Sequence, residues 1–521
     1  MKRTIKIDLG KNKTEEREVN YIPVRYIIAF FITLLEVLAI IGTVVALCIW
    51  VPYFYIAVVI TTFAVELKII ASDDNPDYKI PWMLVVLTIP VAGLMIYFIF
   101  GSRKLKKKYL KRLDDLKNMS YQKDDSAMFA QLEKKDALAC SQAKMLCNIA
   151  DAHLFTNTKQ IYFASGEEYH ESLLKNLKRA TKFIYLEYFI IEEGKFWDSI
   201  LDILKEKAKQ GVDVKVAFDD IGCMATLPEN YAKHLKKFGI EATPFSRLKG
   251  QADSEFNNRN HRKITVIDGI VGYTGGINIA DEYINDFEKY GHWKDVGLRL
   301  EGEAVWELTK LFLIDFGINV KTLLNPRKDL YPNSNIQENG FIIPFGDGPK
   351  PLYERRVGKS VIQNMLASAT KYFYITTPYL IIDNELCTSI ENAALRGVDV
   401  KIIVPHIPDK KIVFNMTRSF YKRLIGAGVN IYEYNPGFIH GKTYLSDDKY
   451  AMVGTINLDY RSLVHHFENG VWMYNTESIK DLKNDIDDTL KKSIKITPSM
   501  LKTNIFNKIF RAFVRIFAPM L

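Results

Sequence analysis

Two stretches of the chain, "HRKITVIDGIVGYTGGIN" (residues 261–278) and "HGKTYLSDDKYAMVGTIN" (residues 440–457), carry one pattern of polar residues. In each, His-x-Lys is followed after four residues by Asp, and after six more by Gly, then Gly or Thr, any residue, and Asn. A single His-x-Lys is common by chance, whereas two copies with equal internal spacing are not. The pattern predicts that the chain contains one structural unit twice.

The sequence around the two stretches repeats in the same order. "ATKFIYLEYFII" (180–191) is echoed by "ATKYFYITTPYLII" (369–382), and "QGVDVKVAF" (210–218) by "RGVDVKIIV" (396–404). The apolar runs predict strands, and the amphipathic segments between them predict helices. Duplicated domains can pack about an approximate two-fold axis that brings equivalent residues face to face. We therefore expect one site built from both halves.

The residue types in the repeated pattern suit phosphoryl chemistry. Residues two apart in a strand share a face, so each histidine points the same way as the lysine that follows it. One imidazole could attack a phosphodiester while the other acts as general acid and then as general base. The aspartates stand where a turn would also need them, which leaves a structural role open. The predicted catalytic residues are His261, Lys263, Asp268, His440, Lys442 and Asp447.

Further residues are expected to bind the phosphate or to orient the histidines. Amide side chains, and backbone N–H groups at small residues, can stabilise phosphate oxygens. A carboxylate on the second ring nitrogen would fix the tautomer of each histidine, and Asp295 and Glu468 follow the motifs. His465 and His466 have no further metal-ligand spacing around them, which favours an ordinary polar role. The predicted phosphate-binding residues are Gly276, Asn278, Thr455 and Asn457.

The first hundred residues contain long apolar runs. Residues 27–50, broken only by Glu36, and residues 80–100 are each long enough to cross about 30 Å of hydrocarbon as a helix. The shorter run 51–65 predicts a third span. The basic cluster at 103–112 is denser than the basic residues before the first run, so we place everything after it in the cytoplasm. These features predict a multi-pass protein of the cell membrane with cytoplasmic catalytic domains.

The end of the chain has a different amphipathic pattern. In "NIFNKIFRAFVRIFAPML" apolar residues recur at helical spacing with basic residues between them, as in a helix at a membrane surface. Packing against the protein's own core is the alternative. The expected units are a membrane anchor of two to three helices (1–102), a charged helical connector (103–150), a domain with the first motif (151–335), a domain with the second motif (336–495) and a membrane-surface tail (496–521).

Composition narrows the classes of partner. The chain has 521 residues, 48% of them hydrophobic, and a formal net charge of +9, which favours phosphate-bearing partners such as nucleic acid or anionic lipid. Its five cysteines form no CxxC pair, so neither a disulfide framework nor a zinc site is indicated. "GKS" at 358–360 lacks the preceding glycine of a P-loop, which excludes that nucleotide site.

The two motifs resemble the HKD motifs of the phospholipase D superfamily, and their context resembles bacterial cardiolipin synthases over nearly the whole chain. "GGINIADEY" (275–283) and "GTINLDYRS" (454–462) are similar to that family's extensions of the motifs, and residues 81–101 to its last membrane segment. Thr455 stands where the family usually has Ser, and the chain ends in "APML" where Ser-Pro-Leu-Leu is usual. An additional apolar segment precedes the usual anchor.

The resemblance implies a fold and an activity. The fold is α/β: a duplicated phospholipase D fold of two mixed-sheet domains with flanking helices, related by a pseudo-two-fold and preceded by transmembrane helices. The activity is transfer of a phosphatidyl group between two phosphatidylglycerol molecules, which gives cardiolipin and glycerol through a phosphohistidine. His261 is then the nucleophile and His440 the acid and base, although the symmetry leaves the reverse assignment open.

The resemblance also sets expectations for partners. Phosphatidylglycerol and anionic membrane lipid are expected, with no cofactor, metal, nucleotide or nucleic acid, and a homo-oligomer is left open. A membrane-bound phospholipase D-type hydrolase, with water as acceptor, is the main alternative because it would use the same residues. The apolar N-terminal runs and the amphipathic tail disfavour a nuclease, and the completeness of both motifs disfavours an inactive scaffold.

Overall fold

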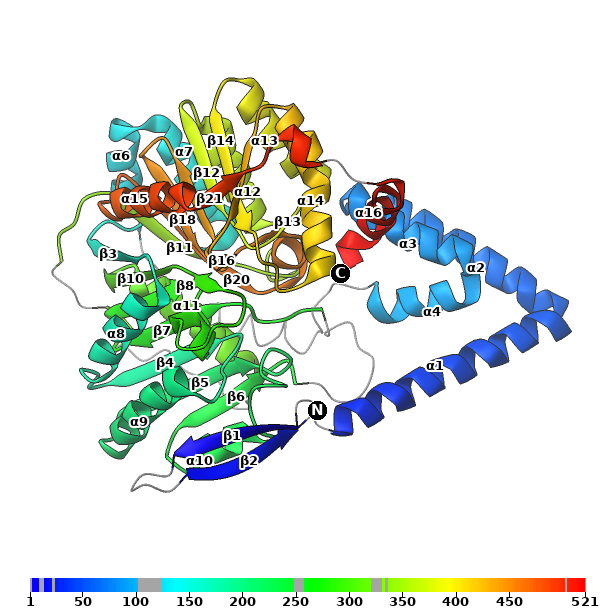
Figure 1. Ribbon diagram of the computed structural model, residues 1–521, viewed down its shortest axis with the longest axis horizontal. Helices are drawn as coiled ribbons and strands as arrows, with labels where there is room; N and C mark the ends of the chain where they lie inside the picture. Colours follow the sequence, from blue (N-terminus) through cyan, green and yellow to red (C-terminus); the bar gives the residue numbers. More distant parts are fainter. Residues whose placement is uncertain are drawn as a thin grey trace.

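The computed structural model describes residues 2–8, 14–20, 24–101, 124–247, 257–319, 330–332, 336–501 and 504–520. Two large mixed sheets with flanking helices form the globular part, and two long N-terminal helices project from it (Figure 1). The basic cluster at 103–112, on which the expected orientation depends, lies outside the described residues.

The first sheet has seven strands in the order β3-β10-β8-β7-β4-β5-β6. Strands β4, β5 and β6 pair in parallel, and the other neighbours are antiparallel. The strands are β3 (Thr158–Phe163), β4 (Phe183–Tyr188), β5 (Asp213–Asp219), β6 (Glu241–Phe245), β7 (Lys263–Ile267), β8 (Val271–Gly275) and β10 (Gly297–Gly302). The helices of this half are α8 (Gly166–Leu177), α9 (Lys195–Lys209), α10 (Tyr231–Lys236) and α11 (Val305–Asn319).

The second sheet repeats that order as β11-β20-β18-β17-β12-β14-β15 and adds β21 at its edge. This correspondence confirms the predicted duplicated α/β fold. The strands are β11 (Phe341–Asp347), β12 (Tyr372–Thr376), β14 (Asp399–Pro405), β15 (Asn430–Tyr434), β17 (Thr443–Ser446), β18 (Tyr450–Gly454), β20 (Glu468–Tyr474) and β21 (Ser493–Lys495). The helices are α12 (Val357–Ser368), α13 (Asn384–Leu395), α14 (Lys411–Gly426) and α15 (Ser478–Lys491).

Local sequence explains these elements. All six residues of β4 are buried, as expected for a strand in the middle of a sheet covered on both faces. Helix α9 buries one apolar face, which includes Trp197 and Leu204, and exposes Lys195 and Lys209. Buried side chains of both sheets, among them Leu298 and Val471, belong to one apolar cluster. This shared core fixes the two halves against each other.

Short segments also pair across the two halves. β16 (Gly437–Ile439) lies parallel to β9 (His292–Lys294), and Asn260 forms a parallel bridge with Phe467. The residues after these pairs are His440 beside Asp295, and His261 beside Glu468. The two pairings occupy equivalent places in the two halves and bring the motifs to the interface.

The N-terminal region begins with a hairpin of β1 (Lys2–Asp8) and β2 (Thr14–Asn20), followed by helices α1 (Val24–Trp50) and α2 (Pro52–Ala71). Both helices contain windows long and apolar enough to cross a membrane, Phe30–Leu47 and Tyr53–Ala71. The first window has no buried residue, so its apolar side chains do not belong to a protein core. Both helices are therefore candidate spans, and α2 contains most of the apolar run 51–65.

The apolar run 80–100, expected to be one membrane-spanning helix, is divided between two short helices. Helix α3 (Pro76–Thr88) ends before Pro90, which cannot donate a backbone hydrogen bond and begins α4 (Pro90–Phe100). A Cβ atom on Gly93 would lie 2.3 Å from the Val85 carbonyl oxygen, so glycine permits α4 to fold back onto α3. The 11 residues of α4 extend only about 16 Å, short of the hydrocarbon thickness.

Helix α3 is instead attached to the second half. The backbone N–H of Asn384 donates to Oδ2 of Asp77 at 2.7 Å, and the Tyr78 hydroxyl lies 3.1 Å from Nε2 of His465. The described part of the connector, α6 (Ser126–Lys135) and α7 (Ala137–Ala150), is helical as expected. It too packs on the second half, where Gln142 of α7 donates to the Ser368 hydroxyl at 2.9 Å.

The C-terminal helix α16 (Ile505–Phe517) combines the two alternatives raised by its sequence. Ile505, Phe506 and Ile509 are exposed, as a helix at a membrane surface requires. Val514 and the buried Ala518 beyond the helix pack against the core of the second half. One side of the tail is therefore free to meet lipid while the other holds it to the protein.

Candidate active site

Each motif histidine is held by the opposite half. The backbone N–H of His261 donates to the Phe467 carbonyl at 2.9 Å, and that of His440 donates to the Lys294 carbonyl at 2.7 Å. Both histidines are buried and lie just before β7 and β17. The cross-half pairings therefore position both imidazoles at one interface.

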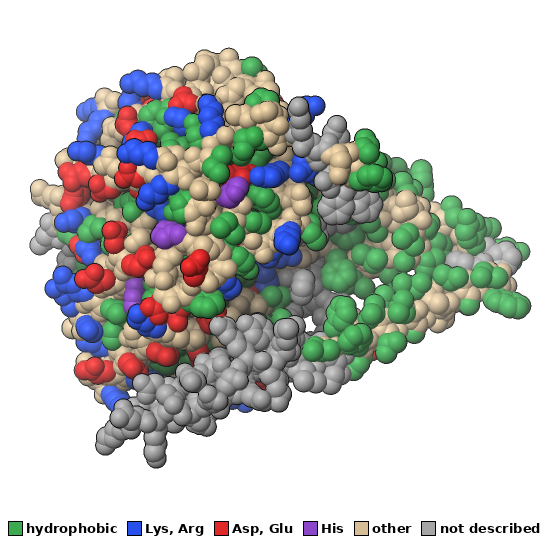
Figure 2. All heavy atoms as spheres, in the orientation of Figure 1, with side chains coloured by type: hydrophobic (Ala, Val, Ile, Leu, Met, Phe, Trp, Pro, Cys, Tyr) green, Lys and Arg blue, Asp and Glu red, His purple; other side chains and the backbone are tan. Residues whose placement is uncertain are grey.

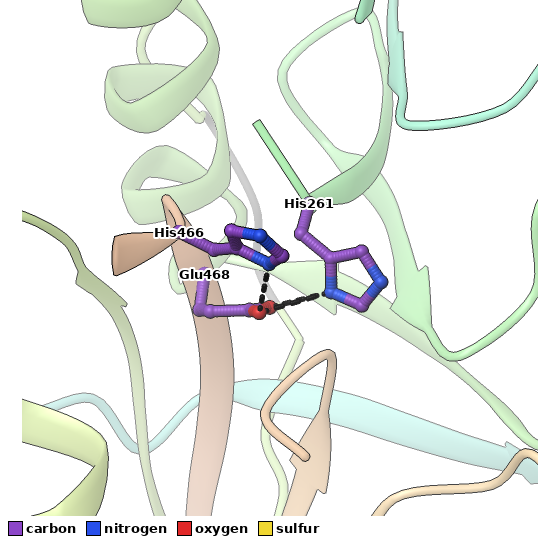
Figure 3. Close-up of side chains that lie close together, drawn as sticks. All are labelled: His261, His466 and Glu468. Atoms are coloured by element: carbon purple, nitrogen blue, oxygen red, sulfur yellow. Dashed lines mark hydrogen bonds and ion pairs between the residues drawn. The ribbon is translucent and has the colours of Figure 1, made fainter. Parts of the chain in front are cut away.

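Glu468 orients His261. Nδ1 of His261 lies 2.9 Å from Oε1 and 3.0 Å from Oε2 of the fully buried carboxylate (Figure 3). Burial alone would raise the pKa of Glu468, but the adjacent His261 and further donors bring it well below its ordinary value. An ionised carboxylate can only accept, so the proton of His261 is on Nδ1 and the lone pair of Nε2 is available for attack.

Asp295 orients His440 in the same way. Nδ1 of His440 lies 2.6 Å from Oδ2 of Asp295, whose Oδ1 accepts from its neighbour's backbone N–H at 2.8 Å. Three aromatic rings surround His440, with centroid distances of 5.5 Å to Tyr283, 5.6 Å to Trp293 and 5.9 Å to Phe438. Each predicted orienting carboxylate therefore serves the histidine of the other half.

Burial keeps both imidazoles neutral. It lowers the pKa of His261 to about 3 and that of His440 to about 4, although each carboxylate acts in the opposite direction. A neutral imidazole is the form that can attack phosphorus. A bound phosphodiester would add a negative charge beside the rings and raise the pKa of the second histidine, which could then hold a proton.

The two motif lysines place positive charge in the same site. Nζ of Lys263 donates to the His261 carbonyl at 2.7 Å, and Nζ of Lys442 donates to the His440 carbonyl. Burial and then repulsion from Lys442 lower the pKa of Lys263 to about 7, and burial lowers that of Lys442 to about 8. Two buried ammonium groups that repel each other favour an anion such as phosphate.

The motif aspartates do not join the site, which corrects their expected catalytic role. The carboxylate of Asp268 accepts from the backbone N–H groups of residues 181, 182 and 183 at 2.8 to 2.9 Å. Asp447 holds residues 370 to 372 in the same way at 2.7 to 2.9 Å. Both aspartates have positive φ, as residues in tight turns often do. Each is separated from its motif histidine by the length of a strand, roughly 16 Å for β7. They clamp the loops that enter β4 and β12.

The two asparagines predicted to bind phosphate differ in their hydrogen bonds. Oδ1 of Asn278 accepts from the Ile190 backbone N–H at 3.1 Å, and its Nδ2 donates to the Tyr283 hydroxyl at 2.7 Å. Asn457 is buried, and its Oδ1 has no hydrogen-bond partner among the residues that the structure describes. Asn278 therefore has a structural role, while Asn457 retains hydrogen-bonding capacity for a substrate.

The small residues act differently from the prediction. The backbone N–H of Gly276 donates to the Val296 carbonyl at 3.0 Å, and that of Thr455 donates to the Asn469 carbonyl at 2.9 Å. Neither N–H is available to phosphate. Instead, Gly276 provides space for Asp295, since a Cβ atom there would lie 2.1 Å from Oδ1 of that residue. The Thr455 hydroxyl donates to Glu468. Both residues therefore position the carboxylates.

Sequence reasoning missed two neighbours of Glu468. The Ser462 hydroxyl donates to Oε1 at 2.7 Å, and the "GTINLDYRS" extension contains this serine. The ring of His466 lies 5.4 Å from that of His261, and its Nδ1 is 3.7 Å from Oε1 of Glu468 (Figure 3). His466 therefore lies beside His261 and Glu468, a position that the sequence did not indicate, and its ordinary polar role stays a prediction.

One cluster has the composition of a metal site. Ligand atoms of His261, His466 and Glu468 all lie within 4.8 Å of one another, and histidine nitrogens with a carboxylate are typical zinc ligands. The hydrogen bond between His261 and Glu468 already provides the orientation that the proposed attack needs. The expectation that the site uses no metal stays a prediction.

Comparison with known proteins places the chain in a family. Residues 173–289 and 362–490 match a family model described as cardiolipin synthase, phospholipase D-like domain, and residues 53–102 match one described as phospholipase D-nuclease N-terminal. A cardiolipin synthase of Alkalihalophilus pseudofirmus is 34% identical over 89% of this chain and 94% of its own length. The chain belongs to the cardiolipin synthase family.

Other relatives agree with this assignment. A cardiolipin synthase of Halalkalibacterium halodurans is 32% identical over 90% of this chain and 94% of its own. The crystal structure of phosphatidylserine synthase from Haemophilus influenzae superposes with a TM-score of 0.54, covering 73% of this chain and 98% of that one at 17% identity, which supports the fold. Membership of the cardiolipin synthase family confirms the predicted resemblance and the predicted enzyme class, a phosphatidyltransferase of the phospholipase D superfamily. With the two candidate spans, it also identifies a membrane protein.

Proposed function

We propose that the protein is a membrane-bound cardiolipin synthase that transfers a phosphatidyl group from one phosphatidylglycerol to another. The observation that carries the proposal is the pair of neutral imidazoles, each oriented by a carboxylate of the opposite half, beside two buried lysines. This arrangement supplies a nucleophile, a proton carrier and charges for a phosphodiester.

In the first step Nε2 of His261 attacks phosphorus and forms an N–P bond. The bond from phosphorus to the headgroup glycerol oxygen breaks. His440, which takes up a proton when the bound phosphodiester raises its pKa, gives that proton to the oxygen and releases glycerol. Glu468 stabilises the positive charge that develops on the His261 ring. Lys263 and Lys442 are the groups proposed to contact the phosphate oxygens, and Oδ1 of Asn457 is proposed to accept from a headgroup hydroxyl.

In the second step a second phosphatidylglycerol is the acceptor. Its terminal headgroup hydroxyl gives a proton to His440 and attacks phosphorus, and the N–P bond breaks to yield cardiolipin and free His261. One phosphodiester replaces another, so no nucleotide is needed as an energy source. The same geometry would hydrolyse phospholipid if water reached the intermediate, and the experiment below separates these outcomes.

The membrane topology follows from the two candidate spans. An even number of spans returns the chain to its starting side, so the basic residues before α1 and the basic cluster at 103–112 are both cytoplasmic in this proposal. Three spans would place these two basic segments on opposite sides of the membrane, whereas two spans place them on the same side. We accordingly propose a multi-pass protein of the cell membrane with cytoplasmic catalytic domains at 151–335 and 336–495.

Incubation of the purified full-length protein with phosphatidylglycerol as sole lipid tests the activity. Cardiolipin and glycerol should appear in equal amounts, as measured by lipid mass spectrometry and an enzymatic glycerol assay. Phosphatidic acid as the main product would replace the transferase proposal with the hydrolase.

A further inference from the structure

One cavity in the described part of the chain is lined by none of the motif histidines. It has a volume of about 710 Å³ and opens between α3, α14 and the C-terminal segment that contains α16. None of the residues that line it belongs to motifs 261–278 or 440–457. Pockets of this size commonly bind small molecules or parts of lipids.

Four cationic side chains and one carboxylate line this cavity: Arg418, Lys422, Arg511, Arg515 and Asp77. The carboxylate already accepts from the Asn384 N–H at 2.7 Å and the Tyr460 hydroxyl at 3.3 Å. Arg418 donates to both carboxylate oxygens of Glu433 at 2.9 and 2.8 Å. The cavity therefore has more positive charge than its own acids neutralise.

Arg511 shows this excess most clearly. Its Nε is buried, without a hydrogen-bond partner within the described ranges. Burial and then the nearby charge of Arg418 lower the pKa of Arg511. A buried donor beside a second guanidinium group favours an anion, and a phosphate accepts from guanidinium groups with good geometry.

The rest of the lining is apolar and adjoins the lipid-facing helices. Ile80, Ile382, Phe420 and Ile516 contribute to the wall, and the guanidinium carbon of Arg515 lies 4.6 Å from the centroid of the Phe420 ring. Figure 2 shows apolar side chains covering the N-terminal helices beside this part of the molecule. A phosphate with an attached hydrocarbon chain matches this lining better than a free phosphate does.

We propose that this cavity binds one anionic phospholipid from the bilayer, separately from the catalytic site. The phosphate contacts Arg511, Arg515 and Lys422, and an acyl chain lies along the apolar wall towards the exposed face of α16. The bound lipid thereby fastens the C-terminal helix to α3 and α14. Binding requires neither motif histidine, so the inference does not rest on the proposed function.

Photocrosslinking tests the site directly. The full-length protein in zwitterionic detergent micelles is labelled with phosphatidic acid that carries a diazirine in its acyl chain, and labelled peptides are identified by mass spectrometry. We expect labels on peptides from α14 and α16. The double variant Arg511→Gln/Arg515→Gln should lower this labelling about tenfold or more, since two charge-assisted contacts are lost.

The matched control is Lys236→Gln/Lys237→Gln, which removes the same charge at exposed positions at the end of α10 and should leave the labelling unchanged. Lys422→Gln, which changes an exposed side chain, should lower the labelling by a smaller factor. This variant still tests the proposal if the double variant does not fold. Full labelling in both pocket variants, or equal labelling by the phosphatidylcholine analogue, would overturn the proposal. Complete competition by millimolar inorganic phosphate would assign the site to free phosphate instead. His261→Ala should retain the labels, whatever its activity.

Discussion

The two halves share their strand order but enclose their histidines differently. Beside His261, the carboxylate of Glu468 accepts hydrogen bonds from the hydroxyl groups of Thr455 and Ser462. The imidazole of His466 lies next to that of His261. Around His440 lie three aromatic rings, Asp295 accepts a backbone N–H, and Nζ of Lys442 is 2.8 Å from Nδ1 of the imidazole. Duplication thus supplied the geometry twice, and divergence of the neighbours made the two imidazoles chemically unequal.

This inequality agrees with the proposed division of labour. A phosphohistidine carries positive charge on its ring, so it needs a carboxylate that stays ionised, and the hydroxyl donors on Glu468 stabilise that state. A proton carrier needs a pKa that responds to the substrate. Burial and then the charge of Lys442 lower the pKa of His440, and a bound phosphate would offset that positive charge and raise the pKa.

The histidine variants test the division of labour itself. His261→Ala and His440→Ala should each lower kcat by about 10⁴-fold or more, because neither half can complete the reaction alone. Only the His440→Ala protein should retain a covalent phosphatidyl adduct, detected as a mass increase of the intact protein. An adduct confined to His261→Ala would reverse the assignment, and near-normal turnover by either variant would exclude a two-histidine mechanism.

The two asparagines should separate catalysis from stability. Asn457→Ala should lower kcat about 10²-fold with an unchanged melting temperature, because its Oδ1 has no partner in the described structure and can accept from a substrate hydroxyl. Asn278→Ala should lower the free energy of unfolding by about 1–3 kcal/mol, because Ile190 and Tyr283 lose a buried partner. Thermal denaturation and initial rates on both proteins provide the comparison. A fall in stability at Asn457 with no change in rate would contradict the assignment.

The pH profile should report the difference between the two lysines. Activity should rise as pH rises through about 3, where His261 loses its proton and becomes able to attack, and should fall above about 7, where Lys263 loses its charge before Lys442 does near 8. Lys263→Arg keeps a cation at alkaline pH, so the fall should move to about 8, and activity at pH 8 relative to pH 6 should rise several-fold, by up to about tenfold. An unshifted alkaline limb would mean that Lys263 does not control it.

His466 marks the smallest difference between the halves. Trp293 precedes Asp295 by two residues, as His466 precedes Glu468, and each packs against a motif histidine. His466→Trp should therefore make the halves more alike and lower kcat only a few-fold, since neither nitrogen of His466 has a hydrogen-bond partner in the described structure. His466→Gln serves as the control for loss of the ring. A loss as large as that of the Asn457 variant would place His466 in the chemistry.

Much of the site could be predicted from the sequence, because the duplicated pattern marks the reactive residues directly. The histidines, the lysines and the two orienting carboxylates lie together as expected. Asp268 and Asp447 were misassigned because an aspartate at the end of a strand can serve a turn as well as a reaction. Their hydrogen bonds to the loops before β4 and β12 decide between these roles.

The membrane region was less predictable, since hydropathy measures apolar length and not helix continuity. Residues 80–100 are apolar enough for a span, but Pro90 divides them and Asp77 attaches α3 to the second half. The run 51–65 was too short on its own, yet α2 continues to Ala71 and includes Glu66 and Lys68. A few local contacts therefore changed the number of candidate spans.

The repeated pattern is enough to establish that one unit occurs twice and that each copy carries an imidazole beside a lysine, and hydropathy is enough to find long apolar helices near the start. Which carboxylate orients which histidine depends on the packing of the two halves. His261 meets Glu468 across 207 residues, and His440 meets Asp295 across 145. Spacing within a motif fixes which side chains share a face of one strand, whereas a pairing between halves depends on how two sheets pack through their common core.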